Sequence, residues 1–370
     1  MIPEFVAPDY LGQSLAQLLP SIVARLTGNN AAIDIPAADT YVVLLVDGLG
    51  QLQLQQYAEH ATHVTSLPAS TLTCGVPSTT ATSLTSLGCG LPPGQHGIVG
   101  YSFRNPFSGE LLNALTWDGG PSDPATLKLV PTIFEQLPQH SCSAGSVTLA
   151  KFAGTALTQI AFSGAEHAPV VKEADVARFA ELVASSARRH DLVYAYHRLL
   201  DHDGHGHGVG SWKWLDRLAE VDDLVSQLQA ALPDGVCLLV TGDHGMVNVP
   251  QNHRITAEEQ PQLAGYELLA GEGRFRQVYT RDPAELAARW AAFLGERALV
   301  LRREEAVEAG WFGPVVAPPA QQRIGDVVVA MRDDWAIMTS QSPKEFSLVG
   351  MHGSLSRAEM LVPLVIAGGR

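Results

Sequence analysis

Residues 41–50 read Tyr-Val-Val-Leu-Leu-Val-Asp-Gly-Leu-Gly, an unbroken apolar run that ends at Asp47. A continuous apolar run is typical of a strand that is buried on both faces of a parallel sheet. In an open α/β sheet, ligands bind beyond the carboxyl ends of the strands, so Asp47 lies where a site is expected. An aspartate at this position is also a common turn or helix-capping residue, so Asp47 alone does not define a site.

Three further segments bring Asp or His close to an apolar run. Residues 192–196 lead into Asp201-His-Asp-Gly-His205, and residues 236–240 lead into Asp243-His244. Less regularly, His352 lies just ahead of the apolar run 361–366. Because such side chains would gather at one sheet edge, the sequence predicts a metal site with several Asp and His ligands.

Strand patterns at 41–46, 62–66, 144–149, 192–196 and 236–241 alternate with helical patterns at 53–60, 78–89, 131–137, 174–188 and 211–231. This alternation predicts an α/β fold, a three-layer α/β/α sandwich around a mostly parallel sheet. Glycines in 201–207 favour a loop there. Residues 10–27 are expected to form one or two short helices.

The pattern changes after Met246. Residues 256–343 combine a strand at 275–279, an amphipathic helix at 282–296 and further short strands, which predicts a small α+β cap inserted into the fold. The expected division is a core of residues 1–255 and 344–370 with a cap of residues 256–343. Arg274 and Arg276 are expected on a solvated face of a cap strand.

The composition excludes several classes of protein. The chain of 370 residues is 46% hydrophobic and carries a net charge of −14, with 24 basic and 38 acidic residues, so no basic nucleic-acid surface is expected. No long apolar segment or signal-peptide pattern is evident, which predicts a cytoplasmic protein without a membrane anchor. The four cysteines lack a Cys-x-x-Cys pair and are expected to be small buried hydrophobic residues. The oligomeric state stays open.

Two segments carry the chemistry. The segment 201–207 holds five candidate ligands, so several combinations are open, and an Asp with a His four residues later suits zinc or manganese. In the Ser/Thr-rich segment 71–97, a helix is expected to begin near 78–80. A hydroxyl there lies where the helix dipole favours anions, and a neighbouring metal could make it a nucleophile. Without a metal it would be an ordinary capping residue.

Together these motifs resemble the alkaline phosphatase superfamily, and within it the type I phosphodiesterase/nucleotide pyrophosphatase branch. The resemblance rests on Val-Asp-Gly at 46–48, Val-Pro-Ser-Thr-Thr at 76–80, Pro-Gly-Gln-His-Gly at 93–97, Asp-His-Asp-Gly-His at 201–205, Asp-His-Gly-Met at 243–246 and His-Gly at 352–353. It covers most of the chain outside the cap and implies an alkaline-phosphatase-like fold.

The resemblance implies a hydrolase of phosphodiester or nucleotide pyrophosphate bonds in small-molecule phosphoesters, with a phosphothreonine intermediate on Thr80. It implies two divalent ions, with zinc expected and manganese as the alternative. The ligands would be Asp201, His205 and His352 for one ion, and Asp47, Asp243, His244 and the Thr80 oxygen for the other.

The chain departs from the family pattern at two positions near the nucleophile. Thr79 stands where relatives often have Lys, and Tyr101 stands where many relatives have an Asn that donates to the phosphate. A phenol donates one hydrogen bond whereas an amide donates two, so Tyr101 is a weaker phosphate donor or only a packing residue. Phosphonate hydrolysis and phosphomonoester hydrolysis are alternatives on the same scaffold, and a non-catalytic metal-binding relative is the rival from another class.

Overall fold

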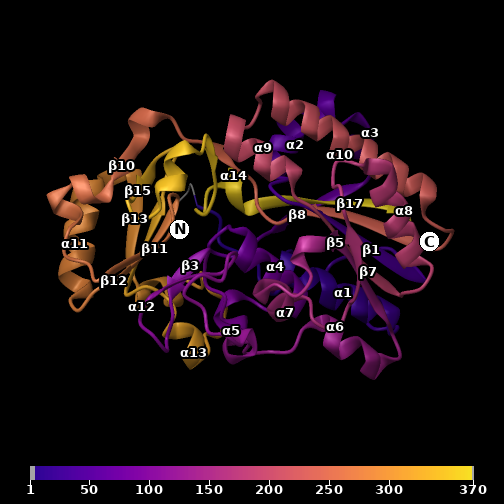
Figure 1. The fold of residues 1–370 in the computed structure, drawn as a ribbon, viewed down its shortest axis with the longest axis horizontal. Coiled ribbons are helices and arrows are strands. Elements are labelled where there is room, and N and C mark those ends of the chain that lie inside the picture. Colours follow the sequence, from indigo (N-terminus) through magenta and orange to yellow (C-terminus); the bar gives the residue numbers. More distant parts are fainter. Residues whose placement is uncertain (1–4, 369–370) are drawn as a thin grey trace.

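A computed structural model describes residues 5–368 and contains a seven-stranded central sheet in the order β2-β17-β8-β1-β7-β5-β6 (Figure 1). The strands are β1 (Thr40–Val46), β2 (Ala69–Thr73), β5 (Ala144–Leu149), β6 (Glu166–Val170), β7 (Leu192–His197), β8 (Val236–Gly242) and β17 (Leu361–Gly368). Strands β8, β1, β7, β5 and β6 pair in parallel, whereas β17 runs antiparallel to both β8 and β2.

Helices cover both faces of this sheet (Figure 1). The alternate β1 residues Val42, Leu44 and Val46 belong to one buried cluster with side chains of α2, α3, α8 and α10. Tyr41, Val43 and Leu45 belong to the opposite cluster, with α1, α4, α6 and α7. The helices are α1 (Leu18–Leu26), α2 (Gln51–Gln56), α3 (Thr62–Ser66), α4 (Thr80–Cys89), α6 (Ile133–Gln136), α7 (Ala156–Ala161), α8 (Val176–Ala187) and α10 (Trp212–Ala231). The predicted three-layer α/β/α sandwich is therefore confirmed.

A second, antiparallel sheet in the order β11-β12-β14-β13 lies beside the first (Figure 1). Its strands are β11 (Leu268–Glu272), β12 (Phe275–Tyr279), β13 (Ala298–Arg302) and β14 (Val327–Met331), and α11 (Pro283–Leu294) packs on it through Leu286, Trp290 and Leu294. Around it lie α12 (Arg303–Glu308), α13 (Pro318–Gln321) and the parallel pair β10 (Arg254–Thr256) and β15 (Ala336–Met338).

Further short elements complete the fold. They are the hairpin of β3 (Ser102–Arg104) and β4 (Leu111–Asn113), the pair β9 (Val247–Asn248) and β16 (Gly350–Met351), α5 (Pro93–His96) and α14 (Arg357–Met360). No helix within residues 5–368 is long and apolar enough to cross a membrane.

The predicted loop at 201–207 is wrong, because Leu199–His207 forms a helix, α9. Glycine weakens an isolated helix by about 1 kcal/mol, and tertiary packing can outweigh that preference. Here the helix packs closely, since a Cβ at Gly204 would lie 2.6 Å from the sulfur of Met246. The helix places His205 one turn after Asp201, which a loop would not guarantee.

Two further predictions are wrong. The strand expected at 62–66 is helix α3, and the edge strand β2 follows it at Ala69–Thr73. Arg274 and Arg276 are not on a solvated face, because both are almost fully buried and pair with Glu359 and Glu345. The alternation of polar and apolar residues along a strand does not show whether a charged residue is exposed or is buried beside an opposite charge.

Candidate active site

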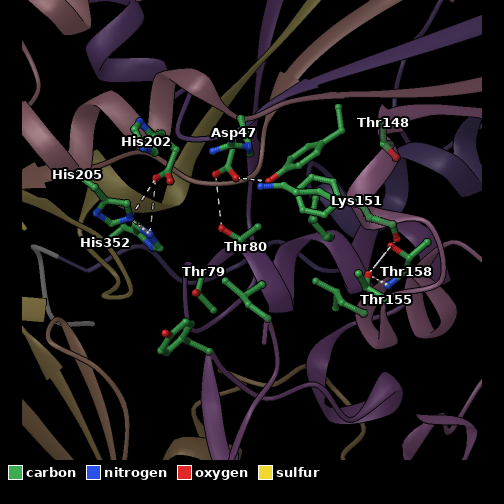
Figure 2. Close-up of a pocket in the computed structure, with 18 of the residues that line it drawn as sticks. Asp47, Thr79, Thr80, Thr148, Lys151, Thr155, Thr158, His202, His205 and His352 are labelled. Atoms are coloured by element: carbon green, nitrogen blue, oxygen red, sulfur yellow. Dashed lines mark hydrogen bonds and ion pairs between the residues drawn. The ribbon is translucent and has the colours of Figure 1, made fainter. Parts of the chain in front are cut away.

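The central sheet brings the candidate residues to one edge. Strands β8, β1 and β7 are neighbours in the sheet. Their carboxyl ends lead to Asp243-His244, to Asp47 and, through α9, to Asp201 and His205. Helix α4 begins at Thr80, and His352 follows β16. Figure 2 shows Asp47, Thr80, His205 and His352 around the same space, although they come from distant parts of the chain.

Asp201, His205 and His352 form the first group of candidate ligands. One ligand atom from each lies within 4.8 Å of the others. His205 Nε2 is 3.4 Å from Asp201 Oδ1 and 3.3 Å from His352 Nε2. Two imidazole nitrogens and one carboxylate oxygen facing a common point make a donor set suited to zinc or manganese.

Asp47, Asp243 and His244 form the second group, next to Thr80. His244 Nε2 lies 3.4 Å from both Asp47 Oδ1 and Asp243 Oδ2. Thr80 Oγ1 lies 3.2 Å from His244 Nε2 and 3.5 Å from Asp47 Oδ1. Ligand atoms of Asp47, Asp201 and His244 also fall within 4.8 Å of one another, so Asp201 faces both groups.

All three histidines are oriented in the same way. Nδ1 donates to the backbone carbonyl of Gly350 in His205, of Gly245 in His244 and of Ser78 in His352, at 2.8 to 2.9 Å. A carbonyl oxygen only accepts, so Nδ1 carries the proton and Nε2 keeps its lone pair toward the site. Hydrogen bonds of this kind fix the tautomer of metal-binding histidines.

Burial makes the ionised form of the site carboxylates unfavourable. Burial, together with the charges of Asp243 and Asp201, raises the pKa of Asp47 well above its ordinary value. Burial also raises the pKa of Asp243. Asp201 Oδ1 and Asp243 Oδ2 are buried without a hydrogen-bond partner among the described residues. Orphaned buried oxygens that face imidazole lone pairs fit divalent cations, which would offset the negative charge.

His352 is neutral at physiological pH. Burial, together with the neighbouring His244 and His205 rings, lowers the pKa of His352 well below its ordinary value. Its ring stacks on that of His244, with centroids 3.6 Å apart. A neutral imidazole is the form that binds a metal.

The stabilisation that metal binding provides is expected to increase with pH. Without metal, the raised pKa values of Asp47 and Asp243 contribute stability below about pH 4 that is lost as pH rises through those values. Metal binding requires the deprotonated carboxylates. At a free metal concentration of 100 times Kd, each site adds about 2.7 kcal/mol. Thermal unfolding at pH 5 and pH 8, with zinc and with chelator, measures the gain, and an equal gain at both pH values would contradict it.

Tyr101 and Glu272 lie beside Thr79 and Thr80, the candidate nucleophile segment. Both line the same cavity as Thr79 and Thr80. Thr79 Oγ1 donates to Glu272 Oε2 at 3.2 Å, and that oxygen lies 3.7 Å from His352 Nδ1. Burial raises the pKa of both Tyr101 and Glu272. Sequence reasoning missed Glu272, because a glutamate between two glycines of the cap gives no signal of its own.

A cavity of about 740 Å³ opens from Thr80, a size typical of small-molecule sites. Its aromatic and aliphatic walls come from α4, α7, β7 and the segment after β5, and comprise Leu84, Phe152, Leu157, Phe162, Tyr194 and Tyr196. Phe162 stacks on Tyr194 with centroids 4.2 Å apart. Leu84, Tyr194 and Tyr196 were predicted only as helix or strand positions, and Phe152, Leu157 and Phe162 were not predicted in any element, since a cavity wall and a core have the same apolar pattern.

Three basic residues line this cavity, and the sequence analysis singled out none of them. The Arg198 guanidinium pairs with Glu173, with Nε 3.2 Å from the carboxylate. Lys151 Nζ lies over the Phe152 ring, 5.2 Å from its centroid. Neither Lys151 nor Lys344 has an ion-pair partner among residues 5–368, so both ammonium groups could meet an anion.

The three-layer α/β/α sandwich, with this site at the carboxyl edge of its mostly parallel sheet, has the fold of the alkaline phosphatase superfamily. The model of the type I phosphodiesterase/nucleotide pyrophosphatase family matches residues 41–355, and the chain belongs to that family. The family consists of hydrolases, and this membership confirms the predicted class of enzyme. No curated protein sequence matches the chain.

Solved structures with the same fold include two kinds of enzyme. Murine ectonucleotide pyrophosphatase/phosphodiesterase 5 is 19% identical, with 89% of this chain and 88% of that chain covered and a TM-score of 0.69. An inactive variant of that protein was solved in complex with AMP. Phosphonoacetate hydrolase from Sinorhizobium meliloti, in complex with phosphonoformate, is 20% identical, with 92% of both chains covered and a TM-score of 0.69.

Proposed function

We propose that this chain hydrolyses phosphodiester or nucleotide pyrophosphate bonds with Thr80 as the nucleophile. The position of Thr80 carries the proposal. Its Oγ1 lies 3.2 Å from His244 Nε2 and 3.5 Å from Asp47 Oδ1, at the start of α4, and Thr80 lines the cavity. A nucleophile, candidate metal ligands and a substrate-sized space therefore meet at one point.

The chemistry would proceed in two displacements at phosphorus. When bound, two divalent ions would lower the pKa of the Thr80 hydroxyl and offset the charge of the phosphoryl group. The Thr80 hydroxyl gives its proton to solvent as Oγ1 forms a bond to phosphorus and the bond to the leaving oxygen breaks, and the leaving oxygen takes up a proton from solvent. Water then attacks phosphorus, the bond between phosphorus and Thr80 Oγ1 breaks, and a proton from that water restores the Thr80 hydroxyl as the phosphate product is released. The amides of the first turn of α4 favour the anionic phosphoryl group throughout.

The cavity favours a phosphoester whose leaving group contains a ring over one whose leaving group is small. Its apolar wall between Phe162 and Tyr196 offers faces on which a planar group can stack. Threonine hydroxyls at 148, 155 and 158 line the same region in Figure 2 and can hydrogen-bond to ring substituents. A nucleoside or another aromatic leaving group fits this combination.

The surroundings of Thr80 favour diesters over phosphomonoesters. A monoester dianion needs an additional cation at the phosphoryl group. Arg274 and Arg276 are used in buried pairs, and Glu272 rather than a basic residue lies beside Thr79. Lys151 and Lys344 support one alternative, a phosphonate that carries a carboxylate, because both line the cavity and neither forms an ion pair within residues 5–368.

Comparative hydrolysis tests this proposal. The purified chain loaded with Zn²⁺ or Mn²⁺ is expected to hydrolyse bis-p-nitrophenyl phosphate with a higher kcat/KM than p-nitrophenyl phosphate. Elemental analysis should find about two ions per chain, as in-line displacement between paired metals requires. Phosphate release from phosphonoacetate, with neither ester cleaved, would favour the phosphonate alternative. A metal-loaded protein that hydrolyses none of the three compounds would contradict the proposal.

A further inference from the structure

Two tyrosines of β7 line the cavity from the same face of the strand. Tyr194 and Tyr196 are two residues apart, so their side chains point to the same side. Their rings are nearly parallel, with centroids 6.4 Å apart and an interplanar angle of 18°. Both are at least nine-tenths buried and both contribute to the aromatic wall of the cavity. As parts of that wall, the two rings are close to equivalent.

Their hydroxyl groups differ. The Tyr196 hydroxyl donates a hydrogen bond to Asp47 Oδ2. The Tyr194 hydroxyl is buried and has no hydrogen-bond partner among the described residues. One of two similar side chains is therefore connected to the candidate metal site, and the other is not.

The two carboxylate oxygens of Asp47 have different roles because only one of them accepts the hydrogen bond from Tyr196. Oδ2 accepts from the phenol, whereas Oδ1 faces the site, 3.4 Å from His244 Nε2 and 3.5 Å from Thr80 Oγ1. Rotation of the carboxylate would break the hydrogen bond inside a buried region, where an unpaired hydroxyl is costly. The phenol thus holds Asp47 with one defined oxygen toward the metal position.

We infer that Tyr196 is a positioning residue that orients Asp47 as a ligand through a single oxygen, in addition to forming part of the cavity wall. The inference rests on the metal site of the proposed function but not on the identity of the substrate. Partners of this kind typically change metal affinity by 10- to 100-fold, because they fix the geometry and basicity of the ligand.

Isosteric variants test the inference through metal binding rather than turnover. Titration of the metal-free protein with Zn²⁺ in competition with a chromophoric chelator would give the affinity of each site. Tyr196→Phe is expected to weaken one of two sites by about 10- to 100-fold. Tyr194→Phe removes a matched hydroxyl from the same wall and is expected to change neither site by more than about twofold. Thermal unfolding of both metal-free variants shows whether each still folds.

The possible outcomes separate this inference from the proposed function. A Tyr196→Phe variant with wild-type metal affinity would overturn the inference, as would equal weakening by Tyr194→Phe. A wild-type chain that binds no metal would overturn the inference and the two-metal proposal together. A chain that binds two ions and shows the expected difference between variants, yet hydrolyses no phosphoester, would support the inference and contradict only the proposed function.

Discussion

Replacing Thr80 with alanine is expected to lower kcat for diester hydrolysis by a factor on the order of 10⁴ or more, because a covalent mechanism cannot begin without its nucleophile. Metal binding should be largely kept, since the carboxylates and imidazoles of the site stay in place. Steady-state kinetics and a zinc titration on the same preparation measure both effects.

Thr85→Ala is the matched control for this substitution. Thr85 is buried in the same helix, and its hydroxyl donates to the carbonyl of Ala81 rather than to the site. It is expected to change kcat by less than about threefold, as is usual for a residue that does not contact the reacting groups. Substantial turnover by Thr80→Ala would instead indicate direct attack by water on the substrate.

The second large effect concerns stability. Glu359 is fully buried and accepts hydrogen bonds from Arg274 Nε at 3.1 Å, Arg274 Nη2 at 2.8 Å and the Ser354 amide at 3.0 Å. Glu359→Gln leaves the Arg274 guanidinium buried without a counter-charge. Loss of one partner of a buried pair typically costs about 3–5 kcal/mol of unfolding free energy. Urea denaturation of the metal-loaded protein measures this loss.

Two comparisons identify the cause of that loss. Glu181→Gln breaks an exposed pair with Arg178 and is expected to cost less than about 1 kcal/mol. A double variant with Arg274→Met and Glu359→Leu removes both charges and should recover most of the stability, because apolar residues can replace a buried pair. A Glu359→Gln variant as stable as Glu181→Gln would contradict the assigned role.

Much of the site could be predicted from the sequence because each part has a local signature. Asp47 and Asp243 end apolar runs that can only be buried strands, and parallel strands deliver their ends to one edge. The resemblance of short motifs then pointed to Asp201, His205, His352 and Thr80, and the structure brings all of these residues together.

Other features depend on contacts between distant segments. The glycines of 201–207 predict a loop, but the segment is helical and packs against Met246 at Gly204. Arg274 is buried with its counter-charge supplied by Glu359, 85 residues later, and with backbone carbonyls of Arg332 and Trp335 accepting from its Nη1. No local pattern indicates that Glu272 of the cap reaches Thr79, 193 positions away.

The sequence by itself determined the α/β architecture and the residue types at the sheet edge. Short segments are enough to indicate a buried strand and the metal-binding residue types that follow it. Only the tertiary structure decided how those residues are oriented. The Nε2 lone pairs of His205 and His352 face inward because backbone carbonyls from other segments accept from Nδ1, and Tyr196 rather than Tyr194 reaches Asp47. Orientation depends on side-chain distances across the fold, and a single sequence does not encode those distances locally.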